Sequence, residues 1–230
     1  MGSPLRGTAS KRGVVPPDED APARGEMRER IKRLTERLLV ERGYASFRFH
    51  EVAEELGITR ASIHYHFSSK QRLCEEVILE SIEKASKYYE GLLTEGELSF
   101  ADRLRRVAKG NRARYLDHNP SGSGRRPWAL ISRIRLEQDQ LPATVRRALF
   151  DFRRSLERSV LGGIKLAVSH GELSPNVPAK QLALLFIAVV NSSDATTRDT
   201  GSFEAMEALY QAYADVALTA YGAELKSGKA

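Results

Sequence analysis

From Glu26 to Tyr221, apolar residues recur every three or four positions, which is the spacing that lines one face of an α-helix. No stretch alternates apolar and polar residues with the period of two that a half-buried strand needs. Glycines, prolines and capping residues interrupt the pattern at intervals, so it indicates separate helices rather than one long coiled coil. The chain is therefore predicted to be all-α.

Local start and stop signals divide this pattern into nine expected helices. Gly43 and Gly57 end the first two, because glycine adopts a positive φ without steric cost. Thr59, Ser69 and Ser99 are candidate N-caps, Ser99 within a possible capping box. Prolines at 127, 142 and 178 suit the first turn of a helix. The expected helices are 26–43, 52–56, 59–67, a long one from 69, 99–117, 127–139, 142–171, 178–196 and 202–221.

The chain is expected to have three parts. Residues 1–25 contain several glycines and prolines and no periodicity, which predicts a disordered arm. Residues 26–72 are expected to form a small three-helix domain, and residues 73–230 a larger helical domain.

The amino-acid composition says less about function than the helical pattern says about the fold. The net charge of +6 permits nucleic-acid binding but does not demonstrate it. Cys74 is the only cysteine, so no intrachain disulfide can form, and the residue is either a small core hydrophobe or a redox sensor. The longest apolar run, 182–190, is about half of what a membrane span requires. We expect a cytoplasmic protein without a membrane partner.

The segment 49–70 is the most informative about function. It holds two short helices joined at Gly57, and its apolar residues are spaced to pack the two helices together, which predicts a helix-turn-helix. No acidic residue occurs from Gly57 to Arg72, although 29% of the chain is charged. A face that approaches phosphates has this character, because a carboxylate there would repel the duplex.

This segment resembles the DNA-binding domain of the TetR family of bacterial repressors. The resemblance covers about residues 26–75, and the later residues agree only in general helical layout. The matching residues are Gly43-Tyr44, Val52-Ala53, Gly57-Ile58-Thr59, Ala61-Ser62-Ile63, His66-Phe67 and Ser69-Lys70.

The resemblance implies an N-terminal helix-turn-helix domain and a larger helical domain that binds a ligand and dimerises. It also implies a sequence-specific regulator that acts as a homodimer on an inverted-repeat operator in double-stranded DNA. A repressor of this kind is released by a small-molecule effector, here of unknown identity. The DNA contacts that it implies come from Thr59, Arg60, Ser62, His64, Tyr65 and Lys70.

The chain departs from the family pattern at two places. The family has a hydroxyl residue that caps the second helix near positions 47 and 48, where this chain has Phe47 and Arg48. Ser46 is then the alternative cap, and Arg48 the alternative phosphate contact. The family often has tyrosine where this chain has His64, so the contact made there is open.

Two sets of residues are expected in the larger domain. Tyr115, Trp128, Phe152, Asn191 and Asp194 are predicted to meet in an effector cavity with apolar walls and a few polar groups. Two apolar stripes are predicted to form a four-helix dimer interface, the alternative being that both pack inside the protomer. The stripes are Leu182, Leu185, Phe186 and Val189, and Phe203, Met206, Tyr210 and Tyr213.

The residues present bear on several alternatives to a DNA-binding regulator with an effector. The chain has no nucleophile elbow, P-loop or dinucleotide fingerprint, so we expect no enzyme, catalytic residue or cofactor. His64 and His66 are two apart on a helix and point to different sides, so no metal is expected. The basic residues between 103 and 135 form either a solvated face or an attraction for an anionic effector such as an acyl-CoA. The alternative functions are an architectural DNA-binding protein without an effector, and a helical carrier whose helix-turn-helix is vestigial.

Overall fold

The computed structural model describes residues 21–223 and contains no β-strand within them, apart from two isolated bridges. The prediction of an all-α fold is confirmed. A 3-10 turn (Gln138–Gln140) follows the sixth of the helices. The α-helices in this range are α1 (Ala21–Ser46), α2 (Phe49–Leu56), α3 (Arg60–His66), α4 (Lys70–Leu93), α5 (Phe100–His118), α6 (Leu130–Arg135), α7 (Ala143–Ser169), α8 (Ala179–Thr200) and α9 (Glu204–Tyr221).

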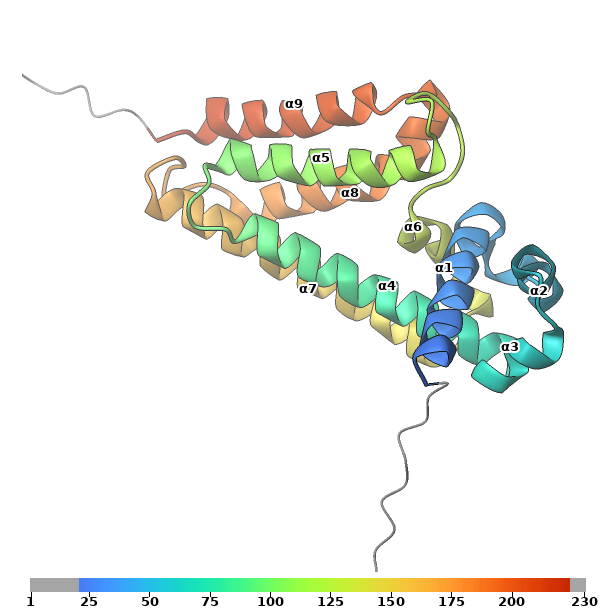
Figure 1. Cartoon of the computed structure of the whole chain (residues 1–230). Coiled ribbons are helices and arrows are strands. Elements are labelled where there is room, and N and C mark those ends of the chain that lie inside the picture. The colour runs from blue at the N-terminus through green and yellow to red at the C-terminus, as the bar shows by residue number, and fades with distance from the viewer. Residues whose placement is uncertain (1–20, 224–230) are drawn as a thin grey trace, which may run out of the picture.

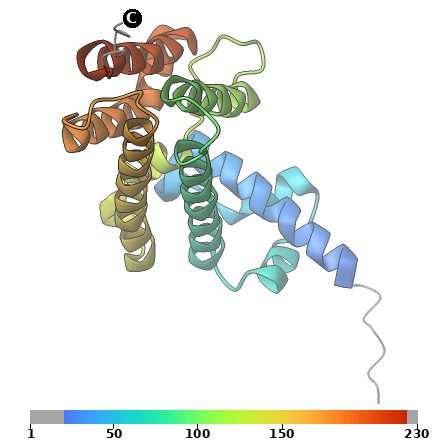
Figure 2. The ribbon, with the colours of Figure 1, turned by 90° about the vertical axis from the view of Figure 1, so that its left-hand side faces the viewer.

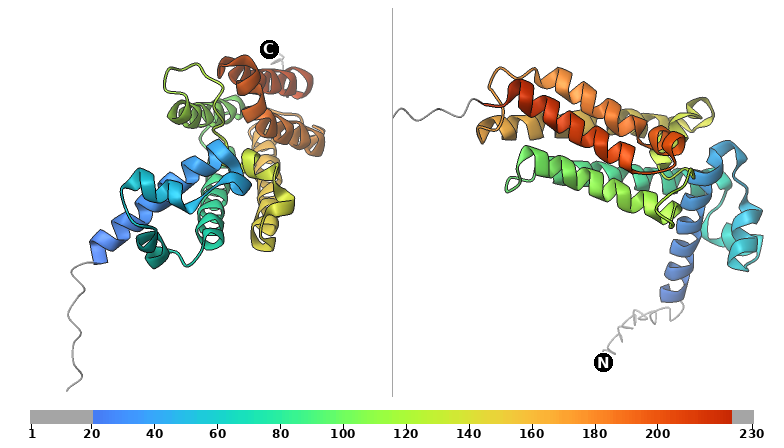
Figure 3. Two further views of the ribbon diagram at one scale, coloured as in Figure 1. Left: turned by 90° about the vertical axis from the view of Figure 1, so that its right-hand side faces the viewer. Right: turned by 90° about the horizontal axis from the view of Figure 1, so that it is seen from above.

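The helices form a small N-terminal unit and a larger body (Figure 1). Helices α1–α3, which we call the reading head, lie at one end of the molecule. In the body α4 packs along α7, and α5, α8 and α9 form a second group beside them, as the views in Figures 2 and 3 agree. One hydrophobic core continues from α1 to α9, so the reading head and the body share packed side chains.

The caps predicted from the sequence are present. Thr59, Ser69 and Ser99 each accept a hydrogen bond through the side-chain oxygen from the backbone N–H three residues later, at 3.1, 3.2 and 3.1 Å. Each bond satisfies one of the N–H groups that a helix start leaves without a partner. Local sequence therefore determines the starts of α3, α4 and α5.

Several helix ends differ from the expectation, among them those of α1 and α8. Helix α1 begins at Ala21 rather than Glu26, so only residues 1–20 of the predicted arm lie outside the described residues. Helix α8 continues to Thr200, four residues past its expected end, because the first residue to leave the helical path is Gly201 at φ 76°.

The prediction that Pro127 opens the sixth helix is wrong. Helix α6 begins at Leu130, because the backbone N–H groups of Trp128 and Ala129 donate to Asp194 of α8 at 3.0 and 3.4 Å. The side chain of Asp194 therefore ties this segment to α8 instead of letting it enter a helix. The contact joins residues more than sixty positions apart, so no local signal announces it.

Candidate DNA-binding interface and effector pocket

Helices α2 and α3 form the predicted helix-turn-helix. Gly57 has φ 65° and ψ 32°, the left-handed conformation that a tight helix end requires. The amide of Ile58 then donates to Ala53 O at 3.0 Å and closes the turn. Val52 and Ile63 are fully buried between the helices, so α3 has a fixed outer face.

The outer face of α3 carries the predicted contact residues. Thr59, Arg60 and His64 are exposed, Ser62 is half-buried, and the ring of Tyr65 is 67% exposed. The structure therefore brings these five residues together on one surface. Because the segment from Gly57 to Arg72 has no carboxylate, this surface presents no negative side chain of its own.

Aromatic contacts orient α3 within the reading head. The His64 imidazole packs edge-on against the Phe49 ring of α2, with ring centroids 5.2 Å apart. The Tyr65 hydroxyl accepts a hydrogen bond from Arg24 of α1 at 3.0 Å. The position that the family often fills with tyrosine is therefore held here by a histidine that packs on the neighbouring helix.

Lys70 and Arg48 form a pair of cations beside α3. The ammonium of Lys70 lies 5.3 Å from the centre of the Tyr44 ring, and burial lowers its pKa. Both cations donate to the same carbonyl, Ala45 O, at 3.5 Å from Lys70 and 2.8 Å from Arg48. Ser46 ends α1 and does not cap α2, whose N-cap position belongs to Arg48.

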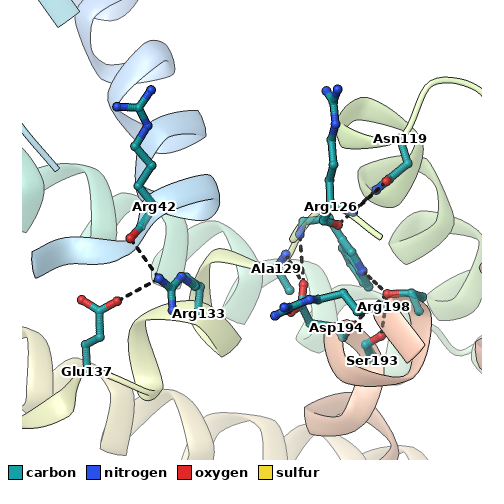
Figure 4. A network of polar contacts seen from close by, with 11 residues as sticks. Arg42, Asn119, Arg126, Ala129, Arg133, Glu137, Ser193, Asp194 and Arg198 are labelled. Atoms are coloured by element: carbon teal, nitrogen blue, oxygen red, sulfur yellow. Dashed lines mark hydrogen bonds and ion pairs between the residues drawn. The ribbon is translucent and has the colours of Figure 1, made fainter. Parts of the chain in front are cut away.

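A polar clamp formed by the end of α6 and the residues that follow it holds the C-terminal end of α1 (Figure 4). Arg133 donates to Arg42 O at 2.9 Å, and Glu137 accepts from the amide of Ala45 at 2.8 Å. The two clamp residues form an ion pair of 3.3 Å. Between these anchor points α1 breaks at Gly43, where φ is 84° and ψ is 174°. The reading head is thus fixed to the body at the point where its first helix leaves helical geometry.

A pocket of about 570 Å³ lies beside this clamp, at the junction of the reading head and the body. We call it the junction pocket. Its wall takes residues from α1, α4, α5, α7, α8 and the segment 128–135, so both parts of the molecule contribute. The inner wall includes the buried side chains of Tyr89, Asn111, Trp128 and Phe152. Its volume is within the usual range for small-molecule sites.

Three of the five residues predicted for an effector cavity line this pocket: Trp128, Phe152 and Asn191. The other two lie behind its wall. The Tyr115 hydroxyl donates to Gly124 O at 2.9 Å, and the ring packs against Trp128 and Phe203. Asp194 is occupied by the amide groups of Trp128 and Ala129, so it positions the wall rather than forming it (Figure 4).

Sequence reasoning did not single out the polar groups of the pocket that come from α4, α5 and α6. Tyr89 belongs to no site predicted from the sequence, and Arg135 falls only within the basic stretch 103–135. Asn111 donates to the hydroxyls of Tyr89 and Tyr210 at 3.3 and 2.8 Å, deep in the body. A polar residue on the apolar face of α5 was the one available signal, because a buried amide needs partners.

The predicted dimer stripes are largely inside the protomer. Six of the eight residues are buried, because α8 and α9 turn these faces toward each other and toward α5 and α7, and Val189 is partly buried. Leu185 alone is exposed, at 54%. The buried six are Leu182, Phe186, Phe203, Met206, Tyr210 and Tyr213. The large apolar residues that α8 and α9 do expose are Leu184, Leu185, Leu209 and Val216.

A second hollow, of about 780 Å³, runs between α5 and α9 and has an alanine-rich floor with basic residues at its rim. Arg105 and Arg112 of that rim are paired with Asp102 and Glu207.

Within residues 21–223, no helix is long and apolar enough to cross a membrane. The same range contains no cluster of three or more metal-ligating side chains of the His, Cys, Asp and Glu types.

Residues 31–77 match the family of bacterial regulatory proteins described as the tetR family. Curated protein sequences gave no significant match. A TetR-family transcriptional regulator from Agrobacterium tumefaciens has a similar structure, with 22% identity, a TM-score of 0.70, and coverage of 87% of this chain and 100% of its own.

Two further solved structures resemble the whole fold. A TetR transcriptional regulator from Chloroflexus aurantiacus is 20% identical over 88% of this chain and 99% of its own, with a TM-score of 0.71. A putative transcriptional regulator from Saccharomonospora viridis, in complex with choline, is 24% identical over 86% of this chain and 98% of its own, with a TM-score of 0.63. Residues 31–77 thus match the helix-turn-helix domain of the tetR family of bacterial regulatory proteins, and the described chain has the fold of solved TetR-family transcriptional regulators.

Proposed function

We propose that the protein is a repressor that binds an inverted-repeat operator as a homodimer and is released when a small molecule enters the junction pocket. The observation that carries this proposal is the position of that pocket. Arg33, Glu36 and Val40 of α1 line it together with residues of the body, so a bound molecule touches the reading head directly. In this proposal residues 26–72 read DNA, and residues 73–230 dimerise and form most of the effector pocket, whose wall α1 completes.

On the DNA, α3 enters the major groove. Arg60 contacts a guanine edge or a phosphate, and Thr59, Ser62 and His64 contact phosphates or base edges. The exposed ring of Tyr65 lies against a sugar or a thymine methyl group. Lys70 and Arg48 are cations without a carboxylate partner in the described part of the chain, and they neutralise phosphates.

Dimerisation uses the exposed faces of α8 and α9. Leu184 and Leu185 on α8 and Leu209 and Val216 on α9 are between 38% and 59% exposed, which is unusual for large apolar side chains in one region. Pairing these faces about a two-fold axis makes a four-helix contact and presents two reading heads to two half-sites.

Release follows from unequal binding to two conformations. A ligand favours the arrangement of α1 and α6 that it contacts best, and this changes the spacing of the two reading heads. The coupling is reciprocal, so operator DNA weakens ligand binding by the same factor. The structure from Saccharomonospora viridis, which shares this fold, was solved with choline, and this supports a small-molecule site in a body of this kind.

Selection of random duplexes by the purified full-length protein tests the DNA-binding proposal. We expect an inverted repeat with half-sites about one helical turn apart, or a longer variant of that spacing. Return of no inverted repeat contradicts it and favours an architectural DNA-binding protein. No enrichment of any sequence, with weak binding to all, favours a helical carrier with a vestigial reading head.

A further inference from the structure

We propose that the junction pocket selects a small organic acid, whose aryl or alkyl body fills the inner wall and whose carboxylate binds Arg135. This inference rests on the proposed function, because it names the ligand class of the same site. It follows from the apolar inner wall, the state of Arg135 and the charges around the pocket.

The inner wall suits an apolar body. Phe152, Trp128 and Tyr89 are each about 95% buried and come from three different segments of the chain. Ala85 adds a small apolar side chain to the same pocket wall. The flat rings and the volume of about 570 Å³ accommodate an aromatic group or a medium-length alkyl chain.

Arg135 is a half-buried cation that lacks a counter-charge. No carboxylate lies within ion-pair distance of it among the described residues; its guanidinium donates instead to the amide oxygen of Asn191. The guanidinium carbon lies 5.6 Å from the centre of the Phe152 ring. Burial lowers the pKa of Arg135, because the guanidinium loses hydration that no neighbouring carboxylate replaces.

The remaining charges around the pocket also favour an anion. Five basic side chains line it against two carboxylates, those of Glu36 and Asp117. Glu36 already accepts a hydrogen bond from Ser81 at 2.7 Å. Arg114, a second guanidinium without a carboxylate partner in residues 21–223, stacks over Tyr88 at 4.4 Å. This excess of positive charge would repel a quaternary ammonium such as choline.

A carboxylate matches Arg135 better than other anions of similar size. The guanidinium presents parallel N–H donors in a planar fork that fits two carboxylate oxygens. Asn191 accepts from Arg135 through its oxygen, which leaves its amide N–H groups available as further donors to the ligand. The ring of Phe152 beneath the guanidinium holds the fork at the edge of the apolar wall.

The test uses matched acids and amides as probes: 4-phenylbutyrate, 3,3-diphenylpropanoate and decanoate, each with its primary amide, and choline. Trp128 is the only tryptophan in the chain and lines the pocket, so its fluorescence reports occupancy directly. Calorimetry of the full chain gives the affinities. We expect at least one acid to bind about 10- to 100-fold more tightly than its amide, as charge-assisted hydrogen bonds would produce.

The variant Arg135→Gln is expected to remove the preference for the acid and to leave the amide affinity within about twofold. Arg135→Lys keeps the charge without the fork and should give an intermediate preference. Lys109→Gln, which removes one positive charge at the α5–α9 hollow, is the matched control and should behave like the natural chain. Helical circular dichroism of each variant identifies loss of folding.

The outcomes separate this inference from the proposed function. If an amide or choline binds as tightly as the acids, or if Arg135→Gln keeps the preference, the acid assignment is overturned even when that ligand releases operator DNA. If an acid binds in an Arg135-dependent manner without lowering operator affinity, the ligand class stands and the proposed release mechanism fails. Absence of any fluorescence change or heat with all three acids overturns the ligand class.

Discussion

Arg60 and Lys70 differ in how the reading head holds them. Arg60 is exposed at the first residue of α3 and has no side-chain hydrogen bond within the described residues, so its guanidinium is free to adjust to a base edge. Lys70 is held over Tyr44 and bonded to Ala45 O, and its ammonium is therefore in place before DNA arrives. A preplaced cation suits a phosphate, whose position does not vary with sequence.

The variants Arg60→Ala and Lys70→Ala should therefore have different effects on operator binding. Arg60→Ala should relax base preference at one position and cost about 1–3 kcal/mol on the preferred sequence. Lys70→Ala should weaken all sequences alike and reduce the slope of log affinity against log salt by about one. Competition binding on the selected operator and its single-base variants measures both, with Arg158→Ala on α7 as the control. If both variants change base preference and salt dependence in the same way, the assignment of a base contact to Arg60 and a phosphate contact to Lys70 is wrong.

Cys74 is the clearest case of a residue whose chemistry depends on burial. It has no exposed surface, and burial raises the pKa of its thiol to about 12. The thiolate is the reactive form, so below this pKa the folded protein presents almost none of it. Alkylation by iodoacetamide between pH 7 and 9 should be slow in the native protein and fast in urea, where the pKa is roughly 8.5. Rapid native alkylation would instead support the redox-sensor reading.

At the residue scale, sequence reasoning succeeded where the determining interaction is local. Thr59 and Ser69 bond to amides three residues away, so their roles are visible in the sequence. Asp194 and Tyr115 make contacts with residues up to 86 positions distant, and these contacts depend on how the helices assemble. Their residue types made a place in a cavity plausible. The sequence does not reveal, however, that backbone amides bind Asp194 and that backbone carbonyls bind the Tyr115 hydroxyl.

At the scale of elements, α6 connects the pocket to the reading head. It carries Arg135, which lines the pocket, and Arg133, which together with Glu137 just after the helix clamps α1. A Cβ at Gly43 would overlap the Glu137 carboxylate and lie 2.7 Å from Arg133, so the clamp closes directly on a glycine backbone. The sequence indicated that Gly43 ends a helix, but the reason for its close packing comes from residues about ninety positions later.

Removing the clamp is expected to weaken the junction. Glu137→Ala leaves the amide of Ala45 without its acceptor and Arg133 without its ion pair, and should lower the free energy of unfolding by about 1–3 kcal/mol. Gly43→Ala should be at least as destabilising, because the positive φ and the overlap act together. Urea unfolding measures both, with Glu157→Ala on α7 as the control. A stable Glu137→Ala variant would show that the clamp contributes nothing to this junction.

The stripes of α8 and α9 show the limit of periodicity as a predictor. Apolar spacing indicates that a helix face is covered, and six of the eight stripe residues are indeed covered. It does not indicate whether the cover comes from the same chain or from a second copy. That distinction required the positions of α5 and α7, which pack on the same faces.

For the whole molecule, we expect the exposed apolar residues of α8 and α9 to determine where a second copy binds. An arginine at Leu185 or Val216 places a charge in the proposed four-helix contact, where it would lack a partner, so each variant should be largely monomeric in sedimentation. Operator affinity should fall by orders of magnitude, because a monomer binds a single half-site and loses the affinity gained when two linked reading heads bind together. Both side chains are more than half exposed in the protomer, so folding should be preserved.

Phe150→Arg is the matched control for these variants. Phe150 is 59% exposed, like Val216, but it lies on α7, where the guanidinium of Arg154 packs over its ring. If exposure of an apolar side chain were enough to hold the dimer, Phe150→Arg would dissociate it as well. We expect it to remain dimeric and to bind the operator normally. A dimer that survives both Leu185→Arg and Val216→Arg would require a different face, and with it a different spacing of the two reading heads on DNA.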